Sequence, residues 1–161
     1  VDDQHMTVLD ILPAKYQGLH IAGRLDLQST GLLLLTNDGH WSRQITQPST
    51  KLPKHYTVTV TNPISQAEVD AFAKGIYFAF EDLTTAPAQL TITATKSAHI
   101  ILHEGRYHQI KRMFGHFRNQ VLRIHRTQVG AIKLPAELHA AGSRAVSPSV
   151  VCAPHLASFT L

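Results

Sequence analysis

Residues 55–61 alternate strictly between apolar and polar side chains, and this feature constrains the fold of the chain more than any other. The two sets alternate one by one: Tyr56, Val58 and Val60 against Thr57, Thr59 and Thr61. A period of two places every second side chain on the same face of a strand, so we expect a half-buried β-strand here. Residues 88–94 alternate in the same way, and residues 98–103 are expected to pair with them as a hairpin.

Helical signals flank these strands. Ser65 and Glu68 form a capping-box pattern, and an apolar face follows until Gly75 ends the expected helix. A second helix is expected over residues 107–117, where several apolar residues share one side: Ile110, Met113, Phe114 and Phe117. A short helix is also expected after the turn-forming residues 37–39.

Further strands complete the pattern. Residues 32–36 indicate a buried strand, and residues 121–125 and 131–134 indicate closing strands. After Leu138 the sequence shows no pattern that assigns an element. Because strands outnumber helices and mostly follow short turns, the expected fold class is α+β. We expect a mixed, mostly antiparallel β-sheet with flanking helices.

The composition of the chain excludes several classes of protein. Hydrophobic residues make up 43% of the 161 positions and charged residues 16%, which is typical of one globular domain and not of a disordered chain. The longest apolar run, residues 32–35, is far shorter than the ~20 residues of a membrane-spanning helix, so we expect no membrane association. A single cysteine rules out an internal disulfide and is typical of the reducing cytoplasm, which is the expected location.

Positive charge is concentrated in one stretch of the chain. Residues 105–136 contain no Asp or Glu and carry a charge of +7, whereas the whole chain carries +4. The cations of this stretch are Arg106, Lys111, Arg112, Arg118, Arg123, Arg126 and Lys133. Such asymmetry fits either a face that binds a polyanion or an ordinary solvated surface. Histidines and aromatic rings between the cations favour RNA, because rings stack on unpaired bases.

An acidic residue stands between two glycines directly before the apolar run. Asp26 follows Gly23 and Arg24 and precedes Gly31, so the pattern places a carboxylate on a loop that is attached to the core. One interpretation is a reactive carboxylate at the mouth of a cleft. The other is a turn aspartate that caps the backbone or pairs with Arg24, and spacing alone does not exclude it.

Two further segments carry candidate functional side chains. Lys54-His55-Tyr56 begins the alternating strand, and its tyrosine is either a core residue or part of a site. Residues 104–113 form a turn that leads into a basic helix. In that helix and turn, Arg106 and Arg112 suit contacts with phosphates, whereas Lys111 can point toward a carboxylate.

Together these three segments resemble the motifs of the pseudouridine synthases. Residues 23–39 match the nucleophile motif of that family, Lys54-His55-Tyr56 matches its K-x-Y strand, and residues 104–113 match its third motif. Within the family the sequence is most similar to the RsuA-type branch, which modifies ribosomal RNA, and the wording of the third motif favours the small-subunit (16S) enzymes. The resemblance implies the pseudouridine synthase fold and runs from about Thr7 to Leu138.

The resemblance also implies a reaction, the site-specific isomerisation of uridine to pseudouridine in ribosomal RNA, with the target base flipped out of its stack. It assigns the nucleophile to Asp26. Lys111, where many relatives have Arg, would be the cation beside that carboxylate, and Tyr56 would stack against the base. The RNA-binding residues would be Arg24, Lys54, Arg106, His108 and Arg112.

The resemblance also implies which cofactors, partner, oligomeric state and domain organisation to expect. The isomerisation needs no metal, nucleotide or redox cofactor, the expected partner is ribosomal RNA, and the expected oligomeric state is a monomer. Relatives usually begin their catalytic domain with an Asn-Lys-Pro strand that follows an S4-type RNA-binding domain. Residues 1–161 match neither feature, so we expect one catalytic domain that is truncated at its N-terminus.

Two other functions fit parts of the pattern. A non-catalytic rRNA-binding module would keep the basic face without the chemistry, but it would not need the intact segment of residues 23–26. A metal site would use some of the 11 histidines. Against it, the chain has no His-Glu-x-x-His or Cys-x-x-Cys spacing.

Overall fold

The computed structural model of the chain describes residues 8–138 and residue 142. The single cysteine, Cys152, lies outside these residues, and so does nearly all of the segment after Leu138 for which the sequence assigns no element. In the part of the chain that is described, no helix is both long enough and apolar enough to span a membrane.

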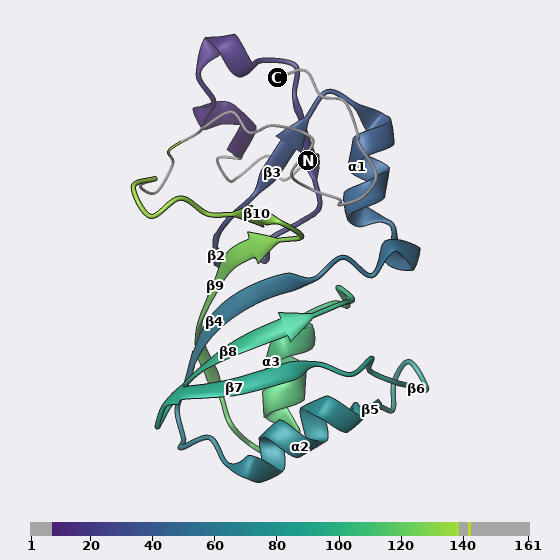
Figure 1. Cartoon of the computed structure of the whole chain (residues 1–161), viewed down its shortest axis with the longest axis vertical. Helices are drawn as coiled ribbons and strands as arrows, with labels where there is room; N and C mark the ends of the chain where they lie inside the picture. The colour runs from purple at the N-terminus through teal and green to yellow at the C-terminus, as the bar shows by residue number, and fades with distance from the viewer. Residues whose placement is uncertain (1–7, 139–141, 143–161) are drawn as a thin grey trace.

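Within the described residues, a sheet of six strands forms the centre of the molecule (Figure 1). Its main path has the order β10–β9–β4–β8–β7, and each neighbouring pair in that path is antiparallel. The strands are β4 (Lys54–Val60), β7 (Gln89–Ala94), β8 (Ser97–Leu102), β9 (Val121–Val129) and β10 (Ile132–Lys133). The sixth strand, β2 (Thr30–Gly31), pairs with β9 in parallel. The predicted α+β class with a mostly antiparallel sheet is confirmed.

Two helices pack against one face of this sheet and enclose the larger apolar core (Figure 1). They are α2 (Gln66–Lys74) and α3 (Gln109–Gly115). Phe72 and Phe114 meet between them with ring centroids 4.9 Å apart. Alternate residues of β4 and β8 face the helices and are buried: Val58 and Val60, and Ala98, Ile100 and Leu102. The alternation in the sequence therefore predicted the buried face of β4 correctly.

The N-terminus of α2 has the capping box that the sequence predicts. The N–H of Ser65 donates to Glu68 Oε2 at 2.6 Å, and Glu68 is only 3% exposed. The other carboxylate oxygen of Glu68 accepts a hydrogen bond from Asn119 Nδ2 at 3.0 Å, which joins α2 to the segment after α3. Gly75 ends the helix with a φ of 92°, a value that favours glycine.

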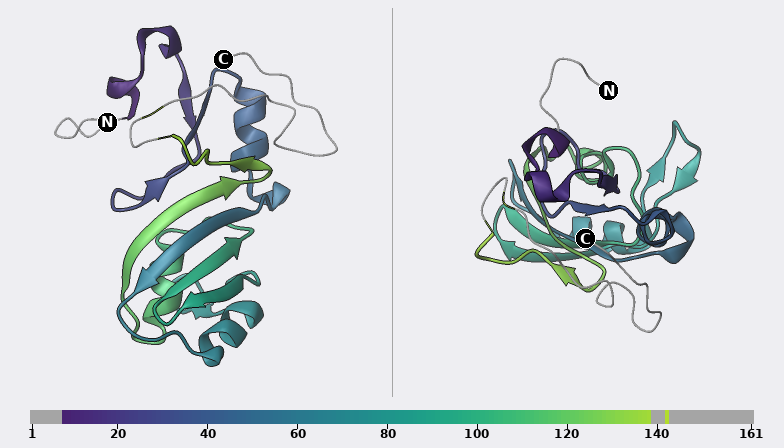
Figure 2. Two further views of the ribbon diagram at one scale, coloured as in Figure 1. Left: turned by 60° about the vertical axis from the view of Figure 1, so that its left-hand side comes forward. Right: turned by 90° about the horizontal axis from the view of Figure 1, so that it is seen from above.

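A second, smaller core lies at the other end of the molecule. It contains residues of β1 (His20–Ala22), β3 (Leu34–Thr36) and α1 (Gly39–Thr46), with Trp41 buried at its centre. The Asp38 carboxylate caps α1 by accepting hydrogen bonds from two N–H groups of its first turn. β9 runs from the larger core to the smaller one as a long, curved strand, with β4 paired along it (Figure 2). The two cores are thus joined by shared strands.

Shorter elements complete the described chain. They are the 3-10 helices η1 (Val8–Ile11), η2 (Ala14–Tyr16) and η3 (Pro48–Thr50), and a hairpin of β5 (Tyr77–Phe78) and β6 (Leu83–Thr84). The helix predicted from residue 107 begins at Gln109, because His108 has a left-handed φ of 46° that no α-helix contains. The strand predicted from residue 32 begins at Leu34. β1 and β2 were not predicted, because strands this short cannot show an alternating pattern.

The face of the sheet opposite the helices carries a histidine pair on β4 and β8. His55 Nδ1 and His99 Nε2 are 3.3 Å apart. Burial lowers the pKa of the His55 imidazole below its ordinary value of 6.5. The positive charges of three neighbours lower this pKa further: His99, His103 and Lys133. Because the pKa is lower in the folded chain, the unfolded chain binds more protons, and the folded state loses stability as the pH falls below about 6.5.

We therefore expect His55→Gln to make the chain less sensitive to acid. Between pH 7.5 and 5.5, the urea midpoint of the variant should fall less than that of the parent chain, with little difference between the two at pH 7.5. The same substitution at His20, an exposed residue of β1, is the matched control. Equal loss of stability in His55→Gln and the parent chain would contradict the prediction.

Candidate active site

A cleft of about 380 Å³ lies between the two cores. The smaller core contributes Ala22, Ile45 and Val129 to its walls, and the larger core contributes Leu102, Ile110 and Ile124. Most of the residues that the sequence proposes for a site also line it: Arg24, Asp26, Lys54, Tyr56, Arg106, His108 and Lys111. The fold therefore brings three distant segments of the chain to one cleft.

Residues 23–32, here called the Asp26 loop, are fixed to β9. β2 pairs in parallel with β9, and the N–H of Leu32 donates to the carbonyl oxygen of Arg126 at 2.8 Å. Gly31 has a φ of 111°, and a Cβ at this position would overlap with the main chain of Arg126. Only glycine permits this close approach, so Gly31 sets where the loop that carries Asp26 leaves the sheet.

The Asp26 carboxylate is partly exposed at the wall of the cleft. His108 Nε2 lies 4.0 Å from Asp26 Oδ2, and the two side chains are 36% and 37% exposed. The sequence hypothesis placed Lys111 beside this carboxylate. The Lys111 ammonium instead donates a hydrogen bond to Gln28 Oε1 at 3.0 Å, because Gln28 lies on the same loop within its reach. Of the described residues, His108 and not Lys111 is the basic group at ion-pair distance from Asp26.

Tyr56 on β4 lines the cleft together with Asp26. Burial raises the pKa of the Tyr56 phenol above its ordinary value, and the negative charge of Asp26 raises it further. The positive charge of the neighbouring Arg126 acts in the opposite direction. The phenol is therefore close to both charged groups, and it stays protonated at neutral pH.

The segment of residues 104–109 is held in shape by Glu104. Its carboxylate accepts hydrogen bonds from the N–H of Ala86 at 2.8 Å, from Arg106 Nε at 3.0 Å and from Gln109 Nε2 at 2.7 Å. The buried Gln109 side chain also accepts a hydrogen bond from the N–H of Arg106 at 3.1 Å. This network fixes the turn before α3, and it engages part of the Arg106 guanidinium.

His108 and Lys54 are two further ionisable residues of the cleft. The ring of His108 is stacked on the exposed ring of Tyr107, with centroids 3.9 Å apart and an angle of 19° between their planes. Burial lowers the pKa of the Lys54 ammonium below its ordinary value, the positive charge of Arg126 lowers it further, and the negative charge of Glu104 opposes both effects. The cleft thus combines the carboxylates of Asp26 and Glu104 with several cationic or protonatable groups.

Arg126 is a cleft residue that the sequence interpretation included only as one cation of the basic stretch. It is 4% exposed. Its Nε donates to the carbonyl oxygen of Leu32 at 2.8 Å, and its Nη1 donates to the carbonyl oxygen of Arg24 at 2.9 Å. The guanidinium therefore contacts both ends of the Asp26 loop.

A β-bulge places Arg126 beside Tyr56. The pairing of β4 with β9 shifts by one residue between His55 and Tyr56, so Tyr56 lies opposite Arg126 and the register skips Thr127. Arg126 follows the inward-facing Ile124 by two positions. The period-two rule, extended two residues beyond the predicted strand of residues 121–125, would therefore have indicated that Arg126 faces inward.

Arg112 does not line the cleft. Its Nη1 and Nη2 donate to the two carboxylate oxygens of Glu81 at 2.7 and 2.6 Å, and its Cζ lies 3.8 Å from the centroid of the Phe78 ring. These contacts hold the β5–β6 hairpin against α3. An RNA phosphate at Arg112, as the sequence predicts, would have to compete with Glu81.

The histidines give no sign of a metal centre in the described part of the chain. Among residues 8–138 and 142, no three His, Cys, Asp or Glu side chains are grouped so that they could hold a metal ion. The close histidine pair, His55 and His99, lies on the sheet face that is opposite the helices.

Comparison with known proteins assigns the chain to a family. The family model described as RNA pseudouridylate synthase matches residues 8–116, which include the Asp26 loop, Tyr56 and the segment from Glu104 to α3. The chain is a member of the RNA pseudouridylate synthase family. In a relative from Pseudomonas aeruginosa, named ribosomal small subunit pseudouridine synthase A, 52% of residues are identical over 152 residues and 94% of this chain.

Other relatives of the chain have the same name. The protein from Yersinia pestis is 40% identical over 96% of this chain, and that from Escherichia coli K12 is 42% identical over 85%. The chain spans 66% of the Pseudomonas protein, 68% of the Yersinia protein and 60% of the Escherichia coli protein. It therefore corresponds to roughly two thirds of these relatives.

Solved structures support the fold of the chain. A crystal structure of a pseudouridylate synthase covers 85% of this chain, with a TM-score of 0.81 and 39% sequence identity, and the match spans 60% of that structure. The archaeal box H/ACA sRNP Nop10–Cbf5 complex contains a chain that covers 78% of this one, with a TM-score of 0.50 and 13% identity over 42% of its own length. The second likeness concerns the fold alone. The predicted pseudouridine synthase fold is confirmed.

Proposed function

We propose that this chain isomerises a specific uridine of small-subunit ribosomal RNA to pseudouridine, with Asp26 as the nucleophile and the target base flipped into the cleft. The observation that carries the proposal is the meeting of Asp26 and Tyr56 in one cleft, in a member of the pseudouridylate synthase family. The choice of small-subunit RNA rests on the names of the relatives. We further propose that the protein acts as a monomer in the cytoplasm, as its resemblance to the family implies.

The proposed reaction has simple chemical requirements. The bond between ribose C1′ and uracil N1 breaks, a bond between C1′ and C5 forms, and the proton lost from C5 balances the proton gained at N1. No oxidation takes place, so a covalent nucleophile and proton transfers are sufficient. Among the described residues, the carboxylates that line the cleft are Asp26 and Glu104. Glu104 accepts hydrogen bonds from three protein groups, which leaves Asp26 as the carboxylate available to a substrate.

The surroundings of Asp26 suit a base that has left its stack. Apolar side chains of both cores form part of the cleft wall, and Tyr56 offers a ring for stacking. Arg24 and Lys54 also line the cleft and supply positive charge for the flanking phosphates. A flipped nucleotide needs such a combination of apolar surface, ring and cation, because it gives up stacking and pairing when it enters.

The proposal is tested by mapping pseudouridine in ribosomal RNA from cells that lack the protein. We expect one modified position to be lost from 16S rRNA, none to be lost from 23S rRNA, and the missing one to return when the gene is restored. RNA that contains 5-fluorouridine provides the test with purified protein, since a catalyst should form a covalent or rearranged product. RNA binding without any such product, and an unchanged map, would favour the non-catalytic binding module.

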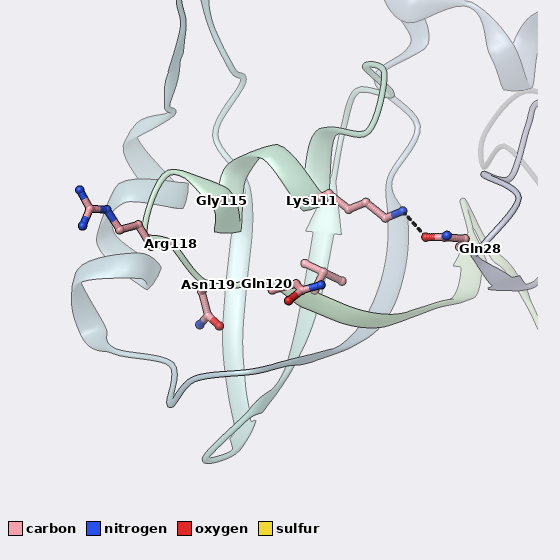
Figure 3. Close-up of a pocket in the computed structure, with 7 residues that line it drawn as sticks. Gln28, Lys111, Gly115, Arg118, Asn119 and Gln120 are labelled. Carbon is pink, nitrogen blue, oxygen red and sulfur yellow. Dashed lines mark hydrogen bonds between the residues drawn. The ribbon is translucent and has the colours of Figure 1, made fainter.

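A basic groove beside the Asp26 loop extends the proposed RNA surface (Figure 3). This groove of about 430 Å³ is lined by Gln28, Lys111, Gly115, Arg118, Asn119, Gln120 and Val121, and no carboxylate is among them. The Lys111 side chain extends toward Gln28, while Arg118 lies at the other end of the groove (Figure 3). Lys111 also lines the cleft, so groove and cleft adjoin. We propose that the groove holds the RNA backbone next to the target nucleotide.

Arg118→Gln should reduce the salt dependence of RNA binding. Arg118 is exposed, and within the described residues it forms no ion pair, so its charge is available to a phosphate. Removal of one phosphate contact lowers the slope of log K against log salt by about one and leaves kcat unchanged. Lys74→Gln, on the exposed end of α2 and outside both cavities, is the control. If the Arg118 variant and the parent chain gave the same slope, the groove would not be part of the RNA-binding surface.

A further inference from the structure

The buried guanidinium of Arg126 is placed between the two residues to which the proposed function assigns the chemistry. It donates to the carbonyl oxygens of Arg24 and Leu32, which lie on either side of Asp26 in the same loop. On the paired strand β4, Tyr56 lies directly opposite Arg126, and both residues line the cleft. One side chain therefore contacts the loop that carries the carboxylate and lies beside the tyrosine of the same cleft.

Arg126 has no carboxylate partner in the described part of the chain. Within those residues, no carboxylate oxygen is found within 4.0 Å of its guanidinium nitrogens, and its hydrogen-bond partners are neutral. A buried charge without an opposite charge is costly, and a neutral side chain of similar size would be cheaper for stability alone. The position of this cation at the cleft therefore indicates a functional role.

Main-chain contacts already hold one end of the Asp26 loop. β2 pairs with β9, and the N–H of Leu32 donates to the carbonyl oxygen of Arg126 whatever side chain residue 126 carries. The guanidinium adds the contact with Arg24 at the other end of the loop, and its positive charge acts on the neighbouring Tyr56 phenol. Beyond attachment of the loop, what remains for the guanidinium is to set the position of Asp26 relative to Tyr56.

We propose that Arg126 is a positioning residue, which sets the Asp26 carboxylate and the Tyr56 phenol in one geometry across the cleft. It acts through these two residues and does not itself touch the reacting atoms. The inference rests on the proposed function, because it assigns Arg126 to the same reaction. The β-bulge at Thr127 supports it, since the shifted pairing is what places Arg126 opposite Tyr56.

The test compares Arg126→Met and Arg126→Lys with the parent chain. For the Met variant we expect kcat to fall by about 100-fold or more, with KM within about three-fold of the parent, because a small misplacement of reacting groups has that effect. The Lys variant keeps the positive charge, but its single ammonium group should not contact both Arg24 and Leu32. We therefore expect kcat to fall nearly as far as in the Met variant. Arg43→Met, on the exposed face of α1 and outside the cleft, is the matched control and should leave both constants unchanged.

A second measurement does not depend on activity. Ultraviolet titration of tyrosine ionisation, with Tyr56→Phe to assign the signal, should show a higher pKa for Tyr56 in Arg126→Met, because a neighbouring positive charge has been removed. A role confined to loop attachment would leave this titration unchanged.

The outcomes separate the two proposals. Parent-like kcat in both variants, together with an unchanged Tyr56 titration, would overturn the role of Arg126. A parent chain that makes no pseudouridine would overturn the proposed function, while the titration would still report whether Arg126 acts on Tyr56. If the Met variant does not fold, the Lys variant decides: lowered kcat at unchanged KM supports the role, and parent-like kcat excludes it.

Discussion

Replacement of Asp26 by Asn is expected to abolish pseudouridine formation, with kcat reduced on the order of 10⁴-fold or more. The amide has nearly the shape of the carboxylate, but it cannot form the covalent intermediate that the proposed reaction requires. Folding should be little affected, because the contact of Asp26 with His108 is long and more than a third of each side chain is exposed. Such a pair contributes less than about 1 kcal/mol. Product should be measured by mapping modified rRNA, and stability by urea unfolding.

The control for this variant is the same substitution on α2. Asp70→Asn alters an exposed carboxylate that accepts a hydrogen bond from Gln66 and lies outside the cleft. Activity should therefore remain that of the parent chain. RNA binding by Asp26→Asn should also stay close to that of the parent. If Asp26→Asn still supported the parental rate, Asp26 would have no part in the chemistry, and the alternative of a turn aspartate would stand.

The second large effect concerns the glycine at which the Asp26 loop meets β9. Gly31→Ala should destabilise the fold by about 3 kcal/mol or more, because the new methyl group would overlap with the main chain of Arg126 in a left-handed conformation. For a chain of this size, that loss corresponds to a fall of roughly 10 °C in Tm. Activity should be lost even below the new Tm, since the displaced loop carries Asp26.

Two other glycines separate the causes of this effect. Gly18 has a φ of 86° with no atom within 4 Å of a new Cβ, so Gly18→Ala should report the backbone strain alone, about 1–2 kcal/mol. Gly39, at the start of α1, has neither a positive φ nor a neighbour, and Gly39→Ala should change stability by less than about 0.5 kcal/mol. If Gly31→Ala resembled Gly18→Ala, the close approach to β9 would not be what holds the loop.

The sequence predicted the helices and strands whose signal lies in a few neighbouring residues. The alternation over residues 55–61 predicted β4 and its buried face, and the Ser65–Glu68 pattern predicted the start of α2. Both are properties of neighbouring residues, which a period or a capping pattern expresses directly. β1 and β2 escaped prediction because they are short and exist only through pairing with distant segments.

The candidate site was predictable as a set of residues but not as a set of contacts. Resemblance to the family identified Asp26, Tyr56 and Lys111, and all of them line the cleft. The hydrogen bond of Lys111 with Gln28, in place of a contact with Asp26, depends on how α3 lies against the loop. No spacing in the sequence records that arrangement, and the central place of Arg126 likewise emerges only when β4 and β9 are paired.

Because of the bulge in β9, the direction in which its side chains point depends on the number of residues in the strand and not only on their types. In a regular strand, Arg126 and Val129 would point to opposite faces, because they are an odd number of positions apart. The extra residue, Thr127, lets Arg126 face the cleft while Val129 packs into the smaller core. A complete set of point substitutions in β9 would leave this count unchanged. Only insertion or deletion of a residue alters it, so tolerance of β9 to substitution is no guide to its tolerance of a change in length.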